Sequence, residues 1–294
     1  MNPGAIAEAV ERPPSPESPI AAVTAGTGER RRPSGNIGSL NDYGRGYFGS
    51  KGASGVWQTI INQIPPHDLF IEAFAGSATI TRRMRRAAAN IVIDSDAAAC
   101  ESCTAIFAET AGGSAMLAGN GDNAGVTVIC ADAVPWLETH RGEFNERTMV
   151  YCDPPYLFDV RSSRRRKRYK RELGETWSHA PLLGVLSRLS TQGVKVLLSG
   201  YRSALYEQWL GHWRRIDYRT MTRGGRRIES LWCNFDEPAE LHDYRFAGAN
   251  FRERERVKRK QKRWTAKLDT MAPKERAALL AAIDEWRRRR LYAK

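Results

Sequence analysis

The sequence predicts a doubly wound α/β fold, in which a mostly parallel sheet carries helices on both faces. Short apolar runs alternate with segments of helical spacing from Tyr43 to about Phe235. This alternation is typical of parallel strands joined by crossover helices. The last two runs, within residues 214–235, flank "RGGRR" and predict an antiparallel hairpin that closes the sheet.

The elements are expected in a regular order along this region. Apolar runs predict strands within residues 68–74, 90–96, 126–133, 148–156 and 194–201. Helical spacing predicts helices at 77–88, from 97 to about 110, at 180–193 and at 203–213, with Ile80 and Met84 on one face of the first. Gly193 is placed to end the third of these helices as a C-cap.

The chain is expected to have three parts. Residues 1–42 are rich in Pro, Ser, Gly and Ala without apolar period, which predicts a disordered leader. Residues 43–240 form the α/β domain. Residues 241–294 form a basic helical C-terminal extension, in which residues 273–291 have the pattern of an amphipathic helix that begins at Pro273.

The composition predicts a soluble protein with a polyanionic partner. The 294 residues include 46 Lys and Arg against 33 Asp and Glu, a net charge of +13. Such an excess favours nucleic acid as a partner. The sequence contains no run of about 18 apolar residues, so no membrane span is expected. Five cysteines form no disulfide framework, which fits a reducing, cytoplasmic compartment, and Cys100 with Cys103 is interpreted as a pair of small apolar residues rather than a metal site.

Three strand ends carry residues suited to a nucleotide-like cofactor. "FIEAFAGSA", residues 70–78, ends a strand in a small-residue turn at Gly76 and opens a helix, whose free N–H groups face a ligand. Asp94 ends the second strand and can accept hydrogen bonds from ribose hydroxyls. Asp132 ends the third strand and can accept from an adenine amine or cap the next turn. The turn is neither G-x-G-x-x-G nor a P-loop, which disfavours a dinucleotide or ATP.

The fourth strand end is the most unusual. "MVYCDPPYLF", residues 149–158, passes from an apolar run into an acid, two prolines and a tyrosine. Proline cannot donate to a central ladder, so the strand ends near Cys152. Asp153, Pro154, Pro155 and Tyr156 are then held stiffly at the carboxyl end of the strand, where ligands bind in open α/β sheets.

These motifs, in this order, resemble those of the Dam-type S-adenosyl-L-methionine-dependent DNA adenine-N6 methyltransferases. "FIEAFAGSA" is similar to the family's cofactor loop and "MVYCDPPY" to its catalytic motif. "GYFGSKG", residues 46–52, resembles the segment before the cofactor loop, and "RIESLWCNF", residues 227–235, resembles the closing strand. The resemblance covers residues 43–235. It departs at Ala73, where proline is common, and at Ala78, where glycine is common.

The resemblance implies a methyltransferase (Rossmann-like) fold and methyl transfer to the N6 amine of a flipped adenine in duplex DNA. Asp153 and the Pro154 carbonyl each accept one hydrogen bond from the amine, which stabilises the positive charge that develops there. Tyr156 stacks on the flipped base. The implied cofactor-binding residues are Tyr47, Lys51, Glu72, Phe74, Gly76, Ser77, Asp94 and Asp132.

Two basic segments are expected to contact DNA. Residues 161–171 hold eight Lys or Arg and no acid, within a recognition insert of about residues 157–180. "TRGGRR", residues 222–227, is the tip of the predicted hairpin. The candidate nucleic-acid-binding residues are Arg164, Arg165, Arg166, Lys167, Arg168, Lys170, Arg223, Arg226 and Arg227.

Other functions stay open at this stage. The alternatives are a cytosine-N4 methyltransferase, an RNA adenine methyltransferase, and a basic DNA-binding protein with an inactive fold. The expected state is a monomer on double-stranded DNA. A partner nuclease, the recognised sequence and the role of the extension are left open.

Overall fold

The computed structural model describes residues 51–52, 55–112, 125–157, 176–222 and 225–292. Residues 1–42, predicted as a leader, lie outside this part. Most of the predicted recognition insert, residues 158–175, also lies outside it.

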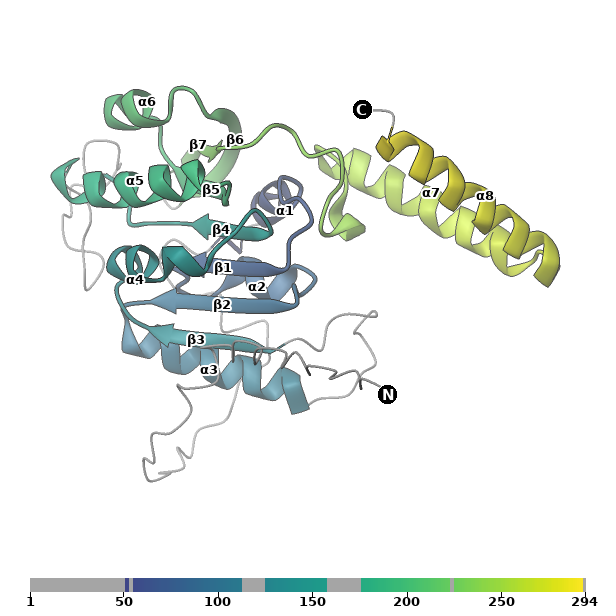
Figure 1. Cartoon of the computed structure of the whole chain (residues 1–294), viewed down its shortest axis with the longest axis horizontal. Coiled ribbons are helices and arrows are strands. Elements are labelled where there is room, and N and C mark those ends of the chain that lie inside the picture. The colour runs from purple at the N-terminus through teal and green to yellow at the C-terminus, as the bar shows by residue number, and fades with distance from the viewer. Residues whose placement is uncertain (1–50, 53–54, 113–124, 158–175, 223–224, 293–294) are drawn as a thin grey trace, which may run out of the picture. The chain divides into compact units, whose positions relative to one another are not determined.

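Seven strands form one mixed sheet in the described part of the chain (Figure 1). The strands are β1 (Leu69–Ala73), β2 (Ala89–Asp94), β3 (Val126–Cys130), β4 (Thr148–Cys152), β5 (Lys195–Gly200), β6 (Arg214–Thr222) and β7 (Gly225–Cys233). Their order in the sheet is β3-β2-β1-β4-β5-β7-β6. Strands β1 to β5 are parallel, while β7 runs antiparallel to β5 and to β6. The predicted doubly wound fold with a closing hairpin is confirmed.

The strand order identifies the edge of the sheet at which a ligand is expected to bind. The chain winds outward from β1 to β3 and then returns to β4 on the other side of β1. This reversal between β1 and β4 is the switch point of a doubly wound sheet, where ligands bind beyond the carboxyl ends of the strands. The registers Ala73↔Ile93 and Ala73↔Cys152 bring the ends of β1, β2 and β4 to one level.

Helices connect the strands. They are α1 (Val56–Ile61), α2 (Thr79–Arg83), α3 (Ala97–Gly112), α4 (Ala133–His140), α5 (Thr176–Thr191) and α6 (Ala204–Leu210). After β7 come a 3₁₀ turn, η4 (Tyr244–Phe246), and the two long helices α7 (Phe251–Asp269) and α8 (Pro273–Tyr292). A further 3₁₀ turn, η2 (Arg141–Glu143), follows α4. The short helices α1 and α4 lie in stretches for which the sequence analysis expected no helix.

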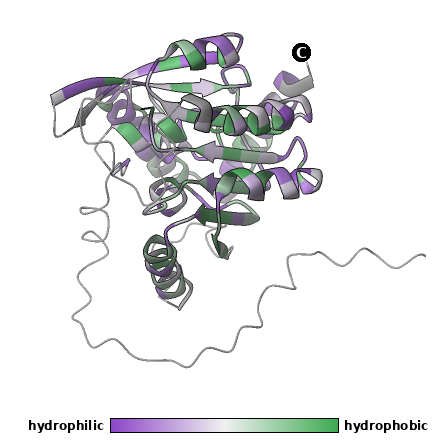
Figure 2. Ribbon diagram, turned by 90° about the vertical axis from the view of Figure 1, so that its left-hand side faces the viewer, coloured by the Kyte–Doolittle hydropathy of each residue, from purple (hydrophilic) through white to green (hydrophobic). Residues whose placement is uncertain are grey.

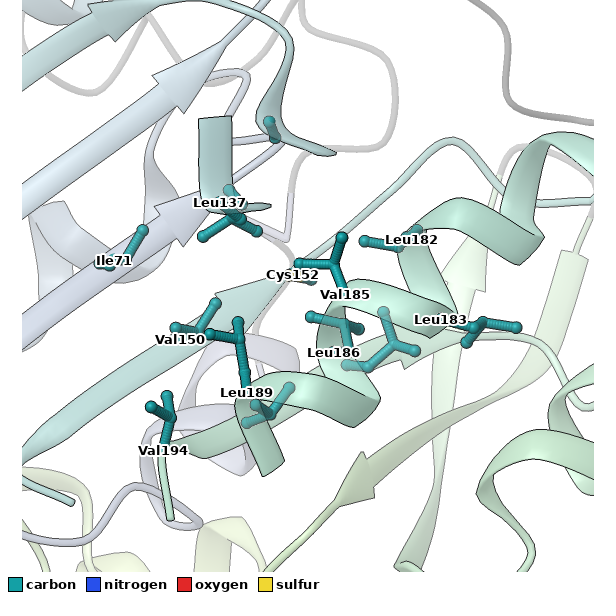
Figure 3. Packing of buried hydrophobic residues seen from close by; sticks show 14 of the residues in the cluster. Ile71, Leu137, Val150, Cys152, Leu182, Leu183, Val185, Leu186, Leu189 and Val194 are labelled. Atoms are coloured by element: carbon teal, nitrogen blue, oxygen red, sulfur yellow. The ribbon is translucent and has the colours of Figure 1, made fainter. Parts of the chain in front are cut away.

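The core lies on both faces of the sheet because strand side chains alternate. Ile71, Val150 and Val196 face the cluster that includes Leu137 of α4 and Leu186 of α5 (Figure 3). On the opposite face, Phe70, Met149, Tyr151 and Leu197 pack with Ile60 of α1 and Ile80 of α2. Figure 2 shows hydrophobic residues both in the strands and in the helices. The near-continuous burial of β4 and β5 follows from coverage on both faces.

One predicted helix is shorter than expected. The sequence predicts a helix over residues 77–88, but α2 ends at Arg83 and Met84 has extended backbone angles. The N–H of Arg85 then donates to Oδ2 of Asp243 at 2.9 Å instead of continuing the helix. Met84 is nevertheless buried in the same cluster as Ile80. A tertiary contact therefore replaces the last turns of a segment whose spacing is helical.

A stacked histidine pair fixes the segment after β7 to the domain. The His242 N–H donates to the carbonyl of Ile64 at 2.9 Å, and its ring stacks on His67 with 3.9 Å between centroids. Both side chains are buried. Burial and the adjacent His242 ring lower the pKa of His67 to about 3. This pair therefore consists of neutral imidazoles at physiological pH.

The start of α7 is defined by a glycine and a cap. Gly248 has φ of +135°, and a Cβ there would lie 2.7 Å from the backbone nitrogen of Arg254. The amide of Asn62 donates to the Gly248 carbonyl at 2.8 Å. Asn250 caps α7 by accepting from the Glu253 N–H at 3.0 Å. None of the described helices has the length and apolar character needed to cross a membrane.

Candidate active site at the switch point

The Asp153–Tyr156 segment is held at the end of β4 from two sides. The Asp153 N–H donates to the Ala73 carbonyl at 3.3 Å, which continues the ladder between β4 and β1. The Pro155 carbonyl lies 3.0 Å from Nε2 of His179, a fully buried residue of α5. Nδ1 of His179 lies 3.0 Å from the hydroxyl of Tyr206 on α6. Two helices thus fix the carbonyl that follows the two prolines.

Lys51 joins this segment to β7. Its ammonium lies 2.9 Å from Oδ1 of Asp153 and 3.1 Å from Oε2 of Glu229, and it also contacts the Tyr156 hydroxyl. The Glu229 oxygen further accepts from the hydroxyls of Tyr156 at 3.1 Å and Tyr218 at 2.9 Å. We call Lys51, Asp153, Tyr156, Tyr218 and Glu229 the acidic cluster, because two carboxylates face one ammonium. Its charge with all three groups ionised is −1.

Burial sets the electrostatics of the acidic cluster. The side chains of Lys51 and Glu229 are 8% and 7% exposed, and that of Asp153 is 17% exposed. Burial raises the pKa of Asp153, and the adjacent Lys51 ammonium opposes this rise only in part. Burial also disfavours the charged form of Lys51, but the surrounding carboxylates outweigh it and raise the pKa of Lys51. Lys51 is therefore a permanent cation that keeps two nearly buried carboxylates together.

Two acceptors at this segment are unused within the described part of the chain. Both contacts of the Asp153 carboxylate, with Lys51 and with the Tyr156 hydroxyl, are made by Oδ1. No described residue donates to Oδ2 of Asp153 or to the Pro154 carbonyl. The Tyr156 ring is half-buried and meets Tyr201 edge to face, with 4.8 Å between centroids. The segment can thus accept two hydrogen bonds from one amine beside an aromatic ring.

The loop after β1 is a tight left-handed turn. Phe74, Gly76 and Ala78 have positive φ of 58°, 51° and 48°. This conformation suits glycine, and the alanine at position 78 stands where the resembled family commonly has glycine. Ala78 is fully buried, so its methyl group contributes packing that offsets the unfavourable backbone angle. Phe74 is half-buried and packs against the core beneath the loop.

Asp94 fixes this loop in place. Its Oδ2 accepts from the Gly76 N–H at 2.8 Å, and its Oδ1 accepts from the Asp96 N–H at 2.8 Å. Each carboxylate oxygen can accept a second hydrogen bond. The Ala75 N–H donates to the Ile93 carbonyl at 3.0 Å. Asp94 thus lies directly beside the turn, where a ribose hydroxyl could add to its existing contacts.

Glu72 and Ser77 have local partners. Glu72 is buried, and its carboxylate accepts from the N–H groups of Ile80 and Thr81 at 3.2 and 2.7 Å and from the Thr81 hydroxyl at 2.5 Å. Burial raises the pKa of Glu72 to about 7, although these hydrogen bonds oppose the rise. Ser77 Oγ lies 3.0 Å from the Thr79 hydroxyl. Glu72 thus holds the start of α2, and its contact with a cofactor amine stays a prediction.

Asp132 lies at the same edge, next to Asp94. The Ala131 N–H donates to the Asp94 carbonyl at 2.9 Å, and Asp132 accepts from the Val134 N–H at 3.2 Å as the N-cap of α4. This position is compatible with both interpretations of Asp132 from the sequence, as a cap of the next turn and as an acceptor for an adenine amine. The register Asp94↔Cys130 carries the edge from β2 to β3.

The candidate residues divide into three groups. The carboxyl ends of β1 to β4 and the segments that follow them carry Glu72, Phe74, Gly76, Ser77, Asp94, Asp132 and Asp153 to Tyr156, whereas Lys51 lies against the Asp153–Tyr156 segment and β7. Arg226 and Arg227 lie at the start of β7, and the Arg227 guanidinium lies 5.8 Å from the Tyr201 ring. Tyr47, Arg164, Arg165, Arg166, Lys167, Arg168, Lys170 and Arg223 lie outside the described residues.

The sequence analysis did not identify Glu229 or Tyr218. The register Tyr218↔Glu229 places them opposite each other on the two arms of the hairpin. A signal was present, since Glu229 is the one charged residue in "IESLWC", the end of β7. A charged residue at a buried strand position needs a partner, but its partner Lys51 is 178 positions away in the chain.

Comparisons with known proteins concern the fold. No family model and no curated protein sequence matches the chain. Among solved structures, M. capricolum TrmK in complex with S-adenosyl-homocysteine has 8% identity and a TM-score of 0.40 over 79% of this chain and 95% of that chain. A SAM-dependent methyltransferase from Agrobacterium tumefaciens has 13% identity and a TM-score of 0.40 over 60% of this chain and 58% of that one. Magnesium protoporphyrin IX methyltransferase from Synechocystis PCC 6803, with bound SAM, has 14% identity and a TM-score of 0.35 over 60% and 75%.

Identities and TM-scores this low transfer no substrate or residue role. The strand order defines the class of fold, a doubly wound, Rossmann-like α/β domain.

Proposed function

We propose that the chain is an S-adenosyl-L-methionine-dependent methyltransferase that acts on the N6 amine of a flipped adenine in duplex DNA. The observation that carries the proposal is the Asp153 segment. Its carboxylate Oδ2 and the Pro154 carbonyl are two unused acceptors in the described part of the chain, and they are fixed at the switch point by β1 and α5. Two acceptors on a rigid turn suit a primary aromatic amine.

The residues present fit the methyl donor. Asp94 has acceptor capacity for ribose hydroxyls beside a turn that includes Gly76, and Asp132 lies on the adjacent strand end. When bound, the cofactor supplies an electrophilic methyl group on a positively charged sulfur. The net charge of −1 on the acidic cluster favours that cation.

The catalytic part of the proposal assigns roles to this chain's own residues. An exocyclic adenine amine is a poor nucleophile because its lone pair is delocalised into the ring. Hydrogen bonds to Asp153 and the Pro154 carbonyl make that lone pair available and stabilise the positive charge that develops. Lys51 orients the Asp153 carboxylate through Oδ1 and leaves Oδ2 for the amine. The Tyr156 ring is expected to stack on the base, which partly offsets the cost of flipping it out of the duplex.

Adenine transfer is favoured over two of the alternatives, cytosine-N4 transfer and an inactive DNA-binding protein. The resembled motif has Asp rather than Ser at the first position, which disfavours cytosine-N4 transfer. Gly76, Asp94 and Asp153 are all present. The Gly76 N–H donates to Asp94, and the Asp153 N–H donates to the end of β1, whereas an inactive DNA-binding protein needs none of these residues.

The test combines donor binding with a panel of acceptors. Calorimetry with S-adenosyl-L-methionine should give binding that Asp94→Ala weakens at least roughly tenfold, since a hydrogen bond to a charged group contributes about 1.5–3 kcal/mol. Labelled donor is then offered to duplex DNA and duplex RNA, and the products are hydrolysed and separated. Label in methyladenine from DNA supports the proposal. Label in methylcytosine or in RNA overturns the substrate, and undiminished donor binding by Asp94→Ala overturns the ribose contact.

A further inference from the structure

Helix α7 carries a continuous line of positive charge. Arg252, Arg256, Arg259, Lys260, Arg263 and Lys267 follow one another at intervals of three and four residues. With 3.6 residues per turn, this spacing places all six on one stripe about 100° wide, and the 15-residue interval is about 22 Å long. We call these six residues the α7 stripe.

The α7 stripe is exposed, and within the described residues none of its members forms an ion pair. All six side chains are exposed, and the ion pairs of the C-terminal helices involve Arg287 and Arg289 instead. The acids of α7 lie off the stripe. Glu253 is turned back to accept from the Ala249 N–H at 3.0 Å. By helical spacing, Glu255 lies about 40° and Asp269 about 80° beyond the edge of the stripe at Arg259.

This arrangement is unfavourable for the free protein. Arg252 with Arg256, Arg256 with Lys260, Arg259 with Arg263, and Arg263 with Lys267 are like-charge pairs at i,i+4. Each such pair destabilises an exposed helix by about 0.2–0.5 kcal/mol. A helix that needs charge only for solubility would alternate acidic and basic residues along one face, because Glu and Lys at i,i+4 attract each other. A polyanion laid along the stripe would reverse this repulsion.

We propose that the α7 stripe binds the phosphate backbone of duplex DNA, as a contact surface separate from the target-adenine site. The choice of DNA among polyanions rests on the proposed function. Arg and Lys in a narrow row suit successive phosphates, and the stripe includes no apolar side chain that would anchor a folded protein. The larger apolar residues of α7, Phe251, Val257, Trp264 and Leu268, are too few for a helix that inserts into a lipid surface. Such contacts position the protein without reading sequence.

The helix offers a matched control for this proposal. Lys258 and Lys262 are exposed and spaced i,i+4, but they lie outside the stripe, about 60–100° beyond its edge at Arg259 by helical spacing. Arg259→Gln with Arg263→Gln and Lys258→Gln with Lys262→Gln therefore remove the same charge from the same two turns. Helical circular dichroism of the full chain and its thermal midpoint confirm that both double variants are folded.

The measurement is fluorescence anisotropy of a labelled duplex between about 50 and 200 mM salt. Each phosphate contact contributes about 0.9 to the slope of log affinity against log salt. The stripe variant, Arg259→Gln with Arg263→Gln, should therefore show a slope that is shallower by nearly 2. Its affinity at about 0.1 M salt should be up to roughly 60-fold lower than that of wild type. The Lys258/Lys262 variant should change the slope by less than about 0.5. The loss should be the same for unrelated duplex sequences.

Several outcomes would overturn the inference. Equal losses in the two double variants would show a response to net charge rather than to the stripe. A loss confined to one duplex sequence would mean base reading. Unchanged DNA binding with impaired binding to duplex RNA or to vesicles of anionic lipid would assign the stripe to that other surface. A wild-type chain that transfers no methyl group while the stripe variant alone loses DNA binding would keep this inference and reject the proposed function.

Discussion

Replacing Lys51 with methionine tests the electrostatics of the acidic cluster. The ammonium is the only cation within 4.0 Å of either Asp153 or Glu229 among the described residues, at 2.9 and 3.1 Å. Its removal leaves two carboxylates that are 17% and 7% exposed. Breaking a buried ion pair from one side costs about 3–5 kcal/mol. Tyr156 and Tyr218 still donate to these carboxylates and Asp153 is partly solvated, so we expect a loss of about 2–3 kcal/mol at pH 8.

The same variant should respond to pH in one direction. Without the cation, the pKa of Asp153 rises further above its ordinary value, so the folded variant takes up a proton that the unfolded chain does not. Stability then falls as the pH rises from the unfolded to the folded pKa, and the loss is smaller at pH 5 than at pH 8. Urea unfolding at both pH values measures this difference. Lys195→Met serves as control, because Lys195 donates to the Glu146 carbonyl at an exposed position and should cost less than about 1 kcal/mol. A loss below about 1 kcal/mol for Lys51→Met, or the same loss at pH 5 and pH 8, would refute this account of the cluster.

Two further predictions concern buried titratable groups. Glu72 has a pKa of about 7 in the folded state, so the wild-type protein loses stability as the pH rises and the buried carboxyl ionises. Glu72→Gln should therefore gain about 2 kcal/mol of stability relative to wild type between pH 5.5 and pH 8. A pH-independent difference in urea unfolding would contradict the raised pKa. His67 has a pKa of about 3. The stability that neutral His67 contributes is therefore complete above the unfolded pKa of histidine and is lost as the pH falls below about 6.5. His67→Phe should gain about 2 kcal/mol of stability relative to wild type between pH 8 and pH 5. If wild type and His67→Phe lose stability in parallel on acidification, the histidine pair is not the acid-sensitive contact.

The sheet could be predicted because its signals are local. Each of β1 to β5 is a short apolar run with a small or polar residue after it, and the position of the proline pair fixes the end of β4. The hairpin follows from two strand-like segments around "RGGRR". The strand ends then carry Asp94, Asp132 and Asp153 to one edge by topology alone, since parallel strands share one carboxyl edge.

The parts that could not be predicted depend on distant contacts. The helical spacing of residues 77–88 is real, but the contact between Arg85 and Asp243 ends α2 early. The acidic cluster needs Lys51, Asp153 and Glu229 from three separate regions, and no spacing in the sequence indicates that they meet. The stacking of His67 on His242 is of the same kind.

The most direct measurement of the central claim is methyl transfer to DNA by wild type and by Asp153→Ala. DNA from cells that lack adenine methylation is incubated with S-adenosyl-L-methionine and hydrolysed, and the nucleosides are quantified by mass spectrometry. Asp236→Ala, an exposed acid after β7, is the control for loss of a carboxylate. Calorimetry confirms that all three proteins bind the donor.

The account predicts N6-methyladenine with wild type and with Asp236→Ala, and at least roughly a hundredfold less with Asp153→Ala. Equal methylation by Asp153→Ala would contradict the role of the Asp153 carboxylate. Donor binding by wild type without any N6-methyladenine in the DNA would contradict the claim that this site methylates adenine in DNA.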